Sequence, residues 1–165
     1  MQYSYEIAMK RANDLIMNAP ANSKVYVGAD SVRTKKRGKW RARYCGIVII
    51  HIAGNKGGQV AYWVEEHDDY STTKNPKQRL LHEANVAIQG VDGVIDACLE
   101  KDFPLEVHLD LNPDPGRNGK NKSNAAVKEA CGWVLSSTGI DPFIKPKAWA
   151  ASRAADEAVK GRMYH

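Results

Sequence analysis

The order of strand-like and helix-like segments constrains the fold of this chain more than any single motif. Three strand-like segments follow one another, and the later ones are separated by helical segments. The predicted strands are 25–32, 44–52, 59–67, 105–112 and 143–147, and the predicted helices are 4–18, 76–100, 123–139 and 152–161. Turn-linked strands pair antiparallel and helix-linked strands pair parallel, which predicts a mixed sheet in one α/β domain.

Each strand prediction depends on a local pattern. Residues 25–32 are rich in β-branched side chains, and residues 44–52 are almost continuously apolar. The segment 54–58, GNKGG, predicts a hairpin turn into 59–67. Residues 105–112, LEVHLDLN, alternate strictly between apolar and polar side chains and form the clearest strand.

The helix predictions follow from periodicity and end signals. In 76–100, apolar residues recur at the helical period, and Pro76 suits the first turn. Ser123 and Ser152 are typical helix caps. We expect a single domain over residues 1–165, in which residues 1–20 form an N-terminal helical extension.

Composition narrows the class of protein. The chain has 165 residues, of which 43% are hydrophobic and 26% charged, as expected for one globular domain. Its longest apolar run, 45–50, is far below the roughly 20 residues that span a bilayer. With no signal-peptide pattern, we expect a cytoplasmic protein, and Cys45, Cys98 and Cys131 are expected to be reduced.

Four carboxylates are placed where such a sheet could bring them together: Asp30, Glu83, Asp110 and Asp156. If the first and fourth strands are parallel neighbours, Asp30 and Asp110 lie side by side. Each carboxylate alone has a simpler interpretation as a solvated side chain. Together, however, they would repel one another unless cations neutralised them, and oxygen ligands favour Mg²⁺ or Mn²⁺, with two ions expected.

The segment 33–43 is the most basic part of the chain, with seven Lys or Arg residues in eleven. We predict that it binds nucleic acid through Arg33, Lys35, Lys36, Arg37, Lys39, Trp40 and Arg41. Lys145 and Ser152 are further candidate phosphate contacts. The simpler alternative is a solvated turn whose charges discourage edge aggregation.

Three polar residues are expected beside the carboxylates: Ser31, His108 and Asn112. His108 shares a predicted strand face with Asp110, although a satisfied core histidine is the simpler interpretation. His51, His67 and His82 show no metal-ligand spacing, and Glu65, Glu66, Asp68 and Asp69 are interpreted as the acidic end of a strand. Patterns for nucleotide cofactors or covalent catalysis do not occur in the sequence.

These residues resemble the YkuK family, which has a ribonuclease H-like fold. The resemblance depends on residues 25–31 (VYVGADS), on Arg79-Leu80 with Glu83, and on residues 107–110 (VHLD). It continues in residues 144–146 (IKP), 150–152 (AAS) and 155–156 (AD). It implies a five-stranded sheet in the order 3-2-1-4-5, with the second strand antiparallel, and a nuclease-like site at the four carboxylates.

Two functions are therefore expected from the sequence. The first is a metal-dependent nuclease that cleaves RNA, an RNA/DNA hybrid or structured DNA by a two-metal-ion mechanism. The alternative is a non-catalytic nucleic-acid-binding module with the same fold, motivated by the basic segment.

Overall fold

The computed structural model describes residues 4–52, 57–71, 77–111 and 124–144. Within these ranges the order of elements agrees with the predicted order. The elements are α1 (Tyr5–Asn18), β1 (Lys24–Lys36), β2 (Lys39–His51), β3 (Gly58–Asp68), α2 (Lys77–Lys101), β4 (Leu105–Leu109) and α3 (Asn124–Thr138).

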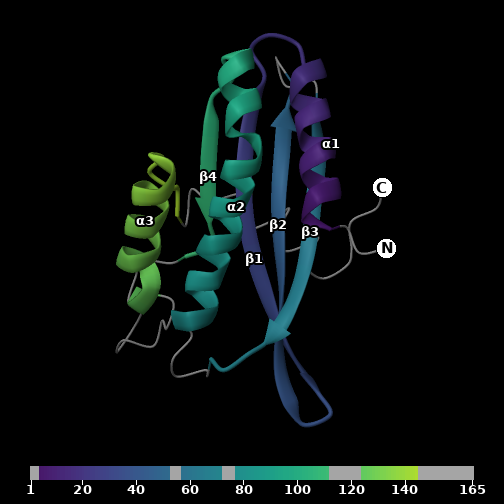
Figure 1. The fold of residues 1–165 in the computed structure, drawn as a ribbon. Coiled ribbons are helices and arrows are strands. Elements are labelled where there is room, and N and C mark those ends of the chain that lie inside the picture. The colour runs from purple at the N-terminus through teal and green to yellow at the C-terminus, as the bar shows by residue number, and fades with distance from the viewer. Residues whose placement is uncertain (1–3, 53–56, 72–76, 112–123, 145–165) are drawn as a thin grey trace.

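The four strands form one mixed sheet in the order β3-β2-β1-β4 (Figure 1). β2 pairs antiparallel with both β1 and β3, whereas β4 pairs parallel with β1. The predicted mixed sheet is therefore confirmed, including the antiparallel second strand and the parallel pairing of the first and fourth.

The fifth strand remains a prediction. Phe143, where this strand was expected to begin, forms an isolated parallel bridge with His108 of β4. The backbone N–H of Phe143 donates to the Val107 carbonyl over 2.8 Å, and its carbonyl accepts from Leu109 N over 2.9 Å. The rest of the expected strand and the expected helix 152–161 lie outside the described residues.

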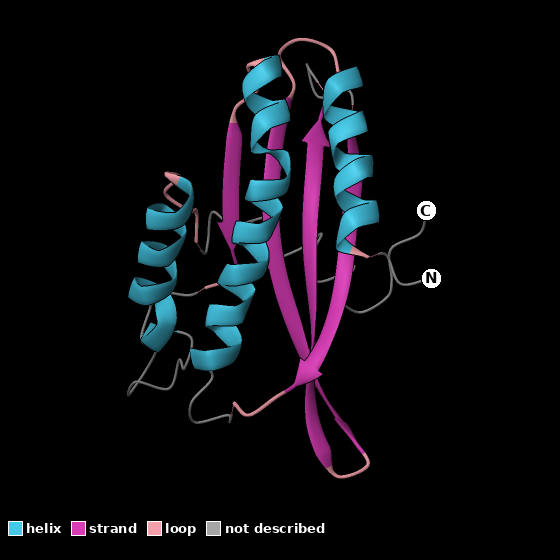
Figure 2. Ribbon diagram, viewed as in Figure 1, coloured by secondary structure: helices cyan, strands magenta, loops and turns pink. Residues whose placement is uncertain are grey.

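Helices α1 and α2 lie side by side on one face of the sheet, and α3 lies beside α2 (Figures 1 and 2). Alternation along β1 points Val25, Val27 and Ala29 into the core beneath α2. Tyr26 points to the opposite face, where it packs with Ile47 and Ile49 in a smaller cluster. In the described part of the chain, no helix is long and apolar enough to cross a membrane.

Two glycines allow α2 and the sheet to close around Trp63, which is buried on β3. A Cβ added at Gly46 would lie 2.1 Å from the Trp63 ring. A Cβ at Gly90 of α2 would lie 2.8 Å from Val27 Cγ1 and 2.9 Å from Trp63 Cη2. Real Cβ atoms do not approach other atoms so closely. The short distance between α2 and the sheet therefore requires glycine, which has no Cβ, at both positions.

The strands β1 and β2 continue well beyond their predicted ends. They pair without interruption as far as Lys36 and Lys39, through the basic segment. Arg37 and Gly38 make the turn with φ angles of 51° and 80°, the left-handed values that a two-residue hairpin turn requires. The basic segment is therefore a two-stranded arm, residues 33–43, and its tip projects past the other strands (Figure 2).

Candidate active site

Asp30 and Asp110 are brought to neighbouring positions by the parallel pairing of β1 with β4. The last paired residues are Ala29 and Leu109, so Asp30 and Asp110 are the next residues along the two chains. Asp30 lies within β1, because the strand continues to Lys36 in the arm. It is 8% exposed, and its Oδ1 accepts a 2.8 Å hydrogen bond from the backbone N–H of Ser31.

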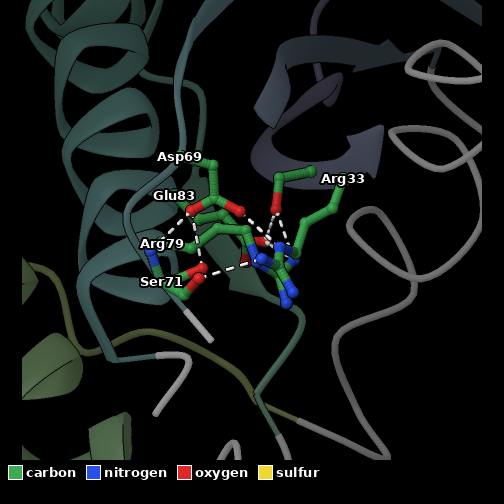
Figure 3. Close-up of polar contacts among 6 residues, drawn as sticks. Arg33, Asp69, Ser71, Arg79 and Glu83 are labelled. Carbon is green, nitrogen blue, oxygen red and sulfur yellow. Dashed lines mark hydrogen bonds and ion pairs between the residues drawn. The ribbon is translucent and has the colours of Figure 1, made fainter. Parts of the chain in front are cut away.

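Glu83 reaches the same region from α2. Glu83 is 3% exposed, and its carboxylate accepts a hydrogen bond from the Ser31 hydroxyl. Arg79, one helical turn earlier, donates from Nη1 to Ser31 Oγ over 2.9 Å and lies 3.9 Å from Glu83 Oε1. Figure 3 shows Arg79 and Glu83 in this network beside Arg33, Asp69 and Ser71. The Ser31 hydroxyl thus links β1 to both charged side chains of α2.

The groups around Glu83 shift the pKa of its carboxyl in opposite directions. Burial raises the pKa of Glu83 well above its ordinary value, and the charges of Asp30 and Asp110 raise it further. The Ser31 hydrogen bond and the Arg79 charge oppose this effect. Three carboxylates from β1, α2 and the end of β4 therefore act on one another electrostatically.

These three residues offer only oxygen atoms, the donors that Mg²⁺ and Mn²⁺ prefer. A divalent cation would offset both the burial of Glu83 and the repulsion from Asp30 and Asp110. The donor set therefore fits the expected metal. Asp156 and Asn112, and the candidate phosphate contacts Lys145 and Ser152, lie outside the described residues.

His108 is buried on the sheet face opposite α2, with 1% of its surface exposed. Its Nε2 lies 3.1 Å from Glu106 Oε2, and its ring contacts Tyr26 and Phe143 at centroid distances of 5.3 and 5.4 Å. Burial lowers its pKa, against the opposing effect of Glu106. These contacts agree with the simpler interpretation, a satisfied core histidine.

Arg33, at the base of the arm, is held by the segment after β3. Its Nε donates to Asp69 and its Nη2 donates to the Ser71 carbonyl over 2.9 Å (Figure 3). Asp69 also accepts from the N–H and the hydroxyl of Ser71 at 2.9 and 2.6 Å. The Arg33 guanidinium lies 4.4 Å from the centre of the Trp40 ring. One cation of the arm is thus already bound within the protein, and it stacks on Trp40, another of the predicted nucleic-acid contacts.

Two more arm cations are paired with acidic residues of β3. Lys36 lies 3.1 Å from Glu66, and Arg41 lies 3.1 Å from Glu66 and 2.6 Å from Asp68. Among the described residues, no ion pair involves the other predicted contacts, Lys35, Arg37 and Lys39. The acidic end of β3 therefore neutralises much of the arm, and its unpaired charge lies toward the tip.

The sequence reasoning did not identify Arg79 as a site residue, although its position four residues before Glu83 on a helix was a usable signal. It also did not group Glu65, His67 and His82, whose side chains meet in the structure. The i, i+2 spacing of Glu65 and His67 signals a shared strand face. The contribution of His82 depends on how α2 packs and has no local signal.

Comparison with known proteins identifies one family. A protein-family model described as Ribonuclease H-like matches residues 8–160. The match confirms the ribonuclease H-like relationship expected from the motifs at residues 25–31, 79–83 and 107–110. No curated protein and no solved structure matched the chain.

Proposed function

Because the chain belongs to the ribonuclease H-like family, we propose that it is a metal-dependent nuclease that hydrolyses phosphodiester bonds in nucleic acid. Its site comprises Asp30, Glu83, Asp110 and Asp156. The observation that carries the proposal is the burial of Glu83 within reach of the charges of Asp30 and Asp110. A buried carboxylate under the repulsion of two other negative charges is costly for the fold alone, and this electrostatic situation is typical of a site that binds cations.

The proposed cofactor is Mg²⁺ or Mn²⁺, bound as two ions. Bound by these carboxylates, the cations supply water activation and stabilisation of the leaving oxygen. The protein supplies the positions of the ligands. Asp30 is fixed by the backbone N–H of Ser31, and Glu83 by the Ser31 hydroxyl. Arg79 fixes that hydroxyl in turn and brings a positive charge to the rim of the site.

The proposed substrate is RNA, an RNA/DNA hybrid or structured DNA, held by the arm. Lys35, Arg37 and Lys39 contribute charge that acidic residues of β3 do not neutralise among the described ion pairs. Lys and Arg bind nucleic-acid backbones by neutralising phosphates. Lys145 and Ser152 remain proposed phosphate contacts on sequence grounds alone.

Cleavage assays with matched variants test the proposal. The purified chain is incubated with end-labelled RNA, hybrid duplex and branched DNA, with Mg²⁺, with Mn²⁺ or with EDTA. We expect metal-dependent cleavage that Asp30→Asn, Asp110→Asn and Glu83→Gln each abolish. Asp96→Asn is the control, because Asp96 is an exposed carboxylate on α2. Cleavage retained in Asp30→Asn, or equal loss in Asp96→Asn, would reject the assignment.

The second candidate function is a non-catalytic nucleic-acid-binding module. The arm favours it, because Lys35, which has no ion pair among the described residues and lies 5.7 Å from the centre of the Trp40 ring, can bind a polyanion without any metal chemistry. This function predicts salt-sensitive binding to the same nucleic acids without turnover under any divalent ion. Binding with no product after prolonged incubation would favour the module over the nuclease.

A further inference from the structure

Glu65 and His67 of β3 and His82 of α2 bring one carboxylate and two imidazoles together. One candidate ligand atom from each residue lies within 4.8 Å of the others. Glu65 Oε2 lies 2.7 Å from His67 Nε2 and 3.9 Å from His82 Nε2. The two imidazole rings meet edge to face, with centroids 5.0 Å apart. Three ligands of two types that commonly bind metals therefore converge from two different elements.

The spacing of these atoms is close to that of a bound metal site. Ligand atoms about 2.1 Å from a tetrahedral ion lie about 3.4 Å from one another. The two distances from Glu65, 2.7 and 3.9 Å, fall on either side of this value. His67 is the most exposed of the three ligands, with 48% of its side chain accessible to solvent.

The cluster also contains polar atoms whose bonding is incomplete. His82 Nε2 and Glu65 Oε1 are buried atoms without a hydrogen-bond partner among the described residues. Both atoms can act as lone-pair donors to a cation, and each belongs to a residue whose candidate ligand atoms meet in the cluster.

A cavity of about 490 Å³ gives access to the cluster. His67 and His82 both line it, together with Arg79, Tyr44 and Trp133. The ring of Tyr44 lies 4.2 Å from that of His82 and closes one side. An ion at this position would have protein ligands on one side and open space on the other, which is the arrangement of metal sites that retain an exchangeable ligand.

The cluster is separate from the carboxylates of the candidate active site. Ser31, which contacts Glu83, is paired across the sheet with Tyr44, and Tyr44 is paired with Glu65. Ser31 and Glu65 are thus two strand spacings apart, about 10 Å between backbones, whereas His82 and Glu83 are consecutive residues of α2. Their donors differ as well, because nitrogen ligands favour transition metals whereas an oxygen-only set favours Mg²⁺ or Mn²⁺.

We propose that Glu65, His67 and His82 form a transition-metal site that takes Zn²⁺, with its remaining coordination position open to the cavity. The ion joins β3 to α2 across the cavity floor. The proposal is independent of the nuclease assignment, since none of its three ligands belongs to the carboxylate site.

Titration of the metal-free full chain with Zn²⁺, measured by calorimetry in the presence of excess Mg²⁺, tests this site. We expect one Zn²⁺ per chain and a Zn²⁺-dependent rise in the thermal unfolding midpoint. His67→Gln and His82→Gln should each weaken binding at least about tenfold. The matched control is His51→Gln, a half-buried histidine of β2 outside the cluster. Asp30→Asn should also retain Zn²⁺ binding.

Three results would overturn the proposal: no Zn²⁺ binding by the unchanged chain, unchanged affinity in both cluster variants, or equal loss in His51→Gln or Asp30→Asn. The absorption spectrum of the Co²⁺-loaded wild-type chain gives a readout that does not depend on variant folding. Nitrogen ligation in a tetrahedral site should give strong visible bands, and a weak octahedral spectrum would contradict the site.

Discussion

The Ser31 hydroxyl donates a hydrogen bond to the carboxylate of Glu83, and so joins the central strand to the long helix at the candidate active site. The same oxygen accepts a 2.9 Å hydrogen bond from Arg79. Because Ser31 follows Asp30 directly, one backbone position fixes both a strand carboxylate and a helix carboxylate. The relative placement of Asp30 and Glu83 therefore depends on Ser31, an uncharged residue.

Ser31→Ala should destabilise the fold and reduce cleavage. The change leaves the buried Glu83 carboxylate and the Arg79 guanidinium without their shared partner. Unsatisfied buried polar groups cost about 1–3 kcal/mol, so we expect the free energy of unfolding to fall by about that amount. Urea denaturation measures it. Ser136→Ala is the control, because Ser136 is exposed on α3 and its hydroxyl donates a 3.1 Å hydrogen bond to the Trp133 carbonyl of the same helix. Equal effects of the two variants would contradict the proposed role of Ser31.

Gly90→Ala should destabilise the protein although alanine is the better helix former. The added Cβ would meet Val27 at 2.8 Å and the buried Trp63 ring at 2.9 Å, so α2 must shift away from the sheet. Overpacking of this kind costs about 1–3 kcal/mol, measured as a lower free energy of unfolding.

Gly132→Ala, which also places alanine in a helix, should instead raise the free energy of unfolding. No atom of the described residues lies within 4 Å of a Cβ at Gly132 of α3, so we expect helix propensity to decide the effect there. We expect a gain of about 0.5–1 kcal/mol in the free energy of unfolding. A stabilising effect of both glycine variants would contradict the tight packing of α2 against Trp63.

The helices and strands could be predicted from the sequence because the periodic spacing of hydrophobic residues is a local signal. The alternation in residues 105–109 and the apolar stripe of α2 both became buried faces, and the pairing of the first and fourth strands followed from their helical connection. The ends of β1 and β2 were wrong because Lys and Arg residues carry little strand propensity. The arm is instead stabilised by cross-strand pairing and by ion pairs such as Arg41 with Asp68.

Some features of the candidate site could likewise be predicted from the sequence, and others could not. The positions of Asp30 and Asp110 follow from strand order, which the sequence contains. The neutralisation of Arg33 by Asp69 joins residues 36 positions apart, and the meeting of His82 with Glu65 depends on the rotation of α2 over the sheet. Neither contact has a periodic signature, because each is decided by tertiary packing.

Acid should weaken the contribution of Glu106 to stability. Burial raises the pKa of Glu106, but Lys24 and His108 outweigh it and leave the pKa below its ordinary value of 4.5. Since the folded-state pKa is lowered, the stabilisation is present above pH 4.5 and is lost as pH falls through the folded-state value. Glu106→Gln should therefore cost about 0.5–1 kcal/mol at neutral pH and nothing at acid pH.

Urea denaturation over a pH series measures this difference. The control is Glu100→Gln, because Glu100 is exposed near the end of α2. A cost for Glu106→Gln that did not change with pH would show that packing, not charge, is responsible.

The arm should bind nucleic acid through its tip more than through its base. Lys35→Gln with Lys39→Gln removes two cations without acidic partners among the described ion pairs. If each neutralises one phosphate of a duplex, the slope of log affinity against log salt should become shallower by about 1.8. Fluorescence anisotropy with a labelled duplex measures this slope. Lys10→Gln with Lys128→Gln removes the same net charge from exposed positions on α1 and α3 and should leave the slope unchanged.

Arg33→Gln should act differently from the tip variant because its guanidinium is bound by Asp69 and Ser71. Its loss leaves Asp69, whose side chain is 3% exposed, as a buried charge without its cation. We therefore expect a loss of stability of about 3–5 kcal/mol, typical of breaking a buried pair, with little change in the salt slope. Unfolding and anisotropy are measured on the same samples. A large change in slope without loss of stability would mean that Arg33 leaves Asp69 to bind phosphate.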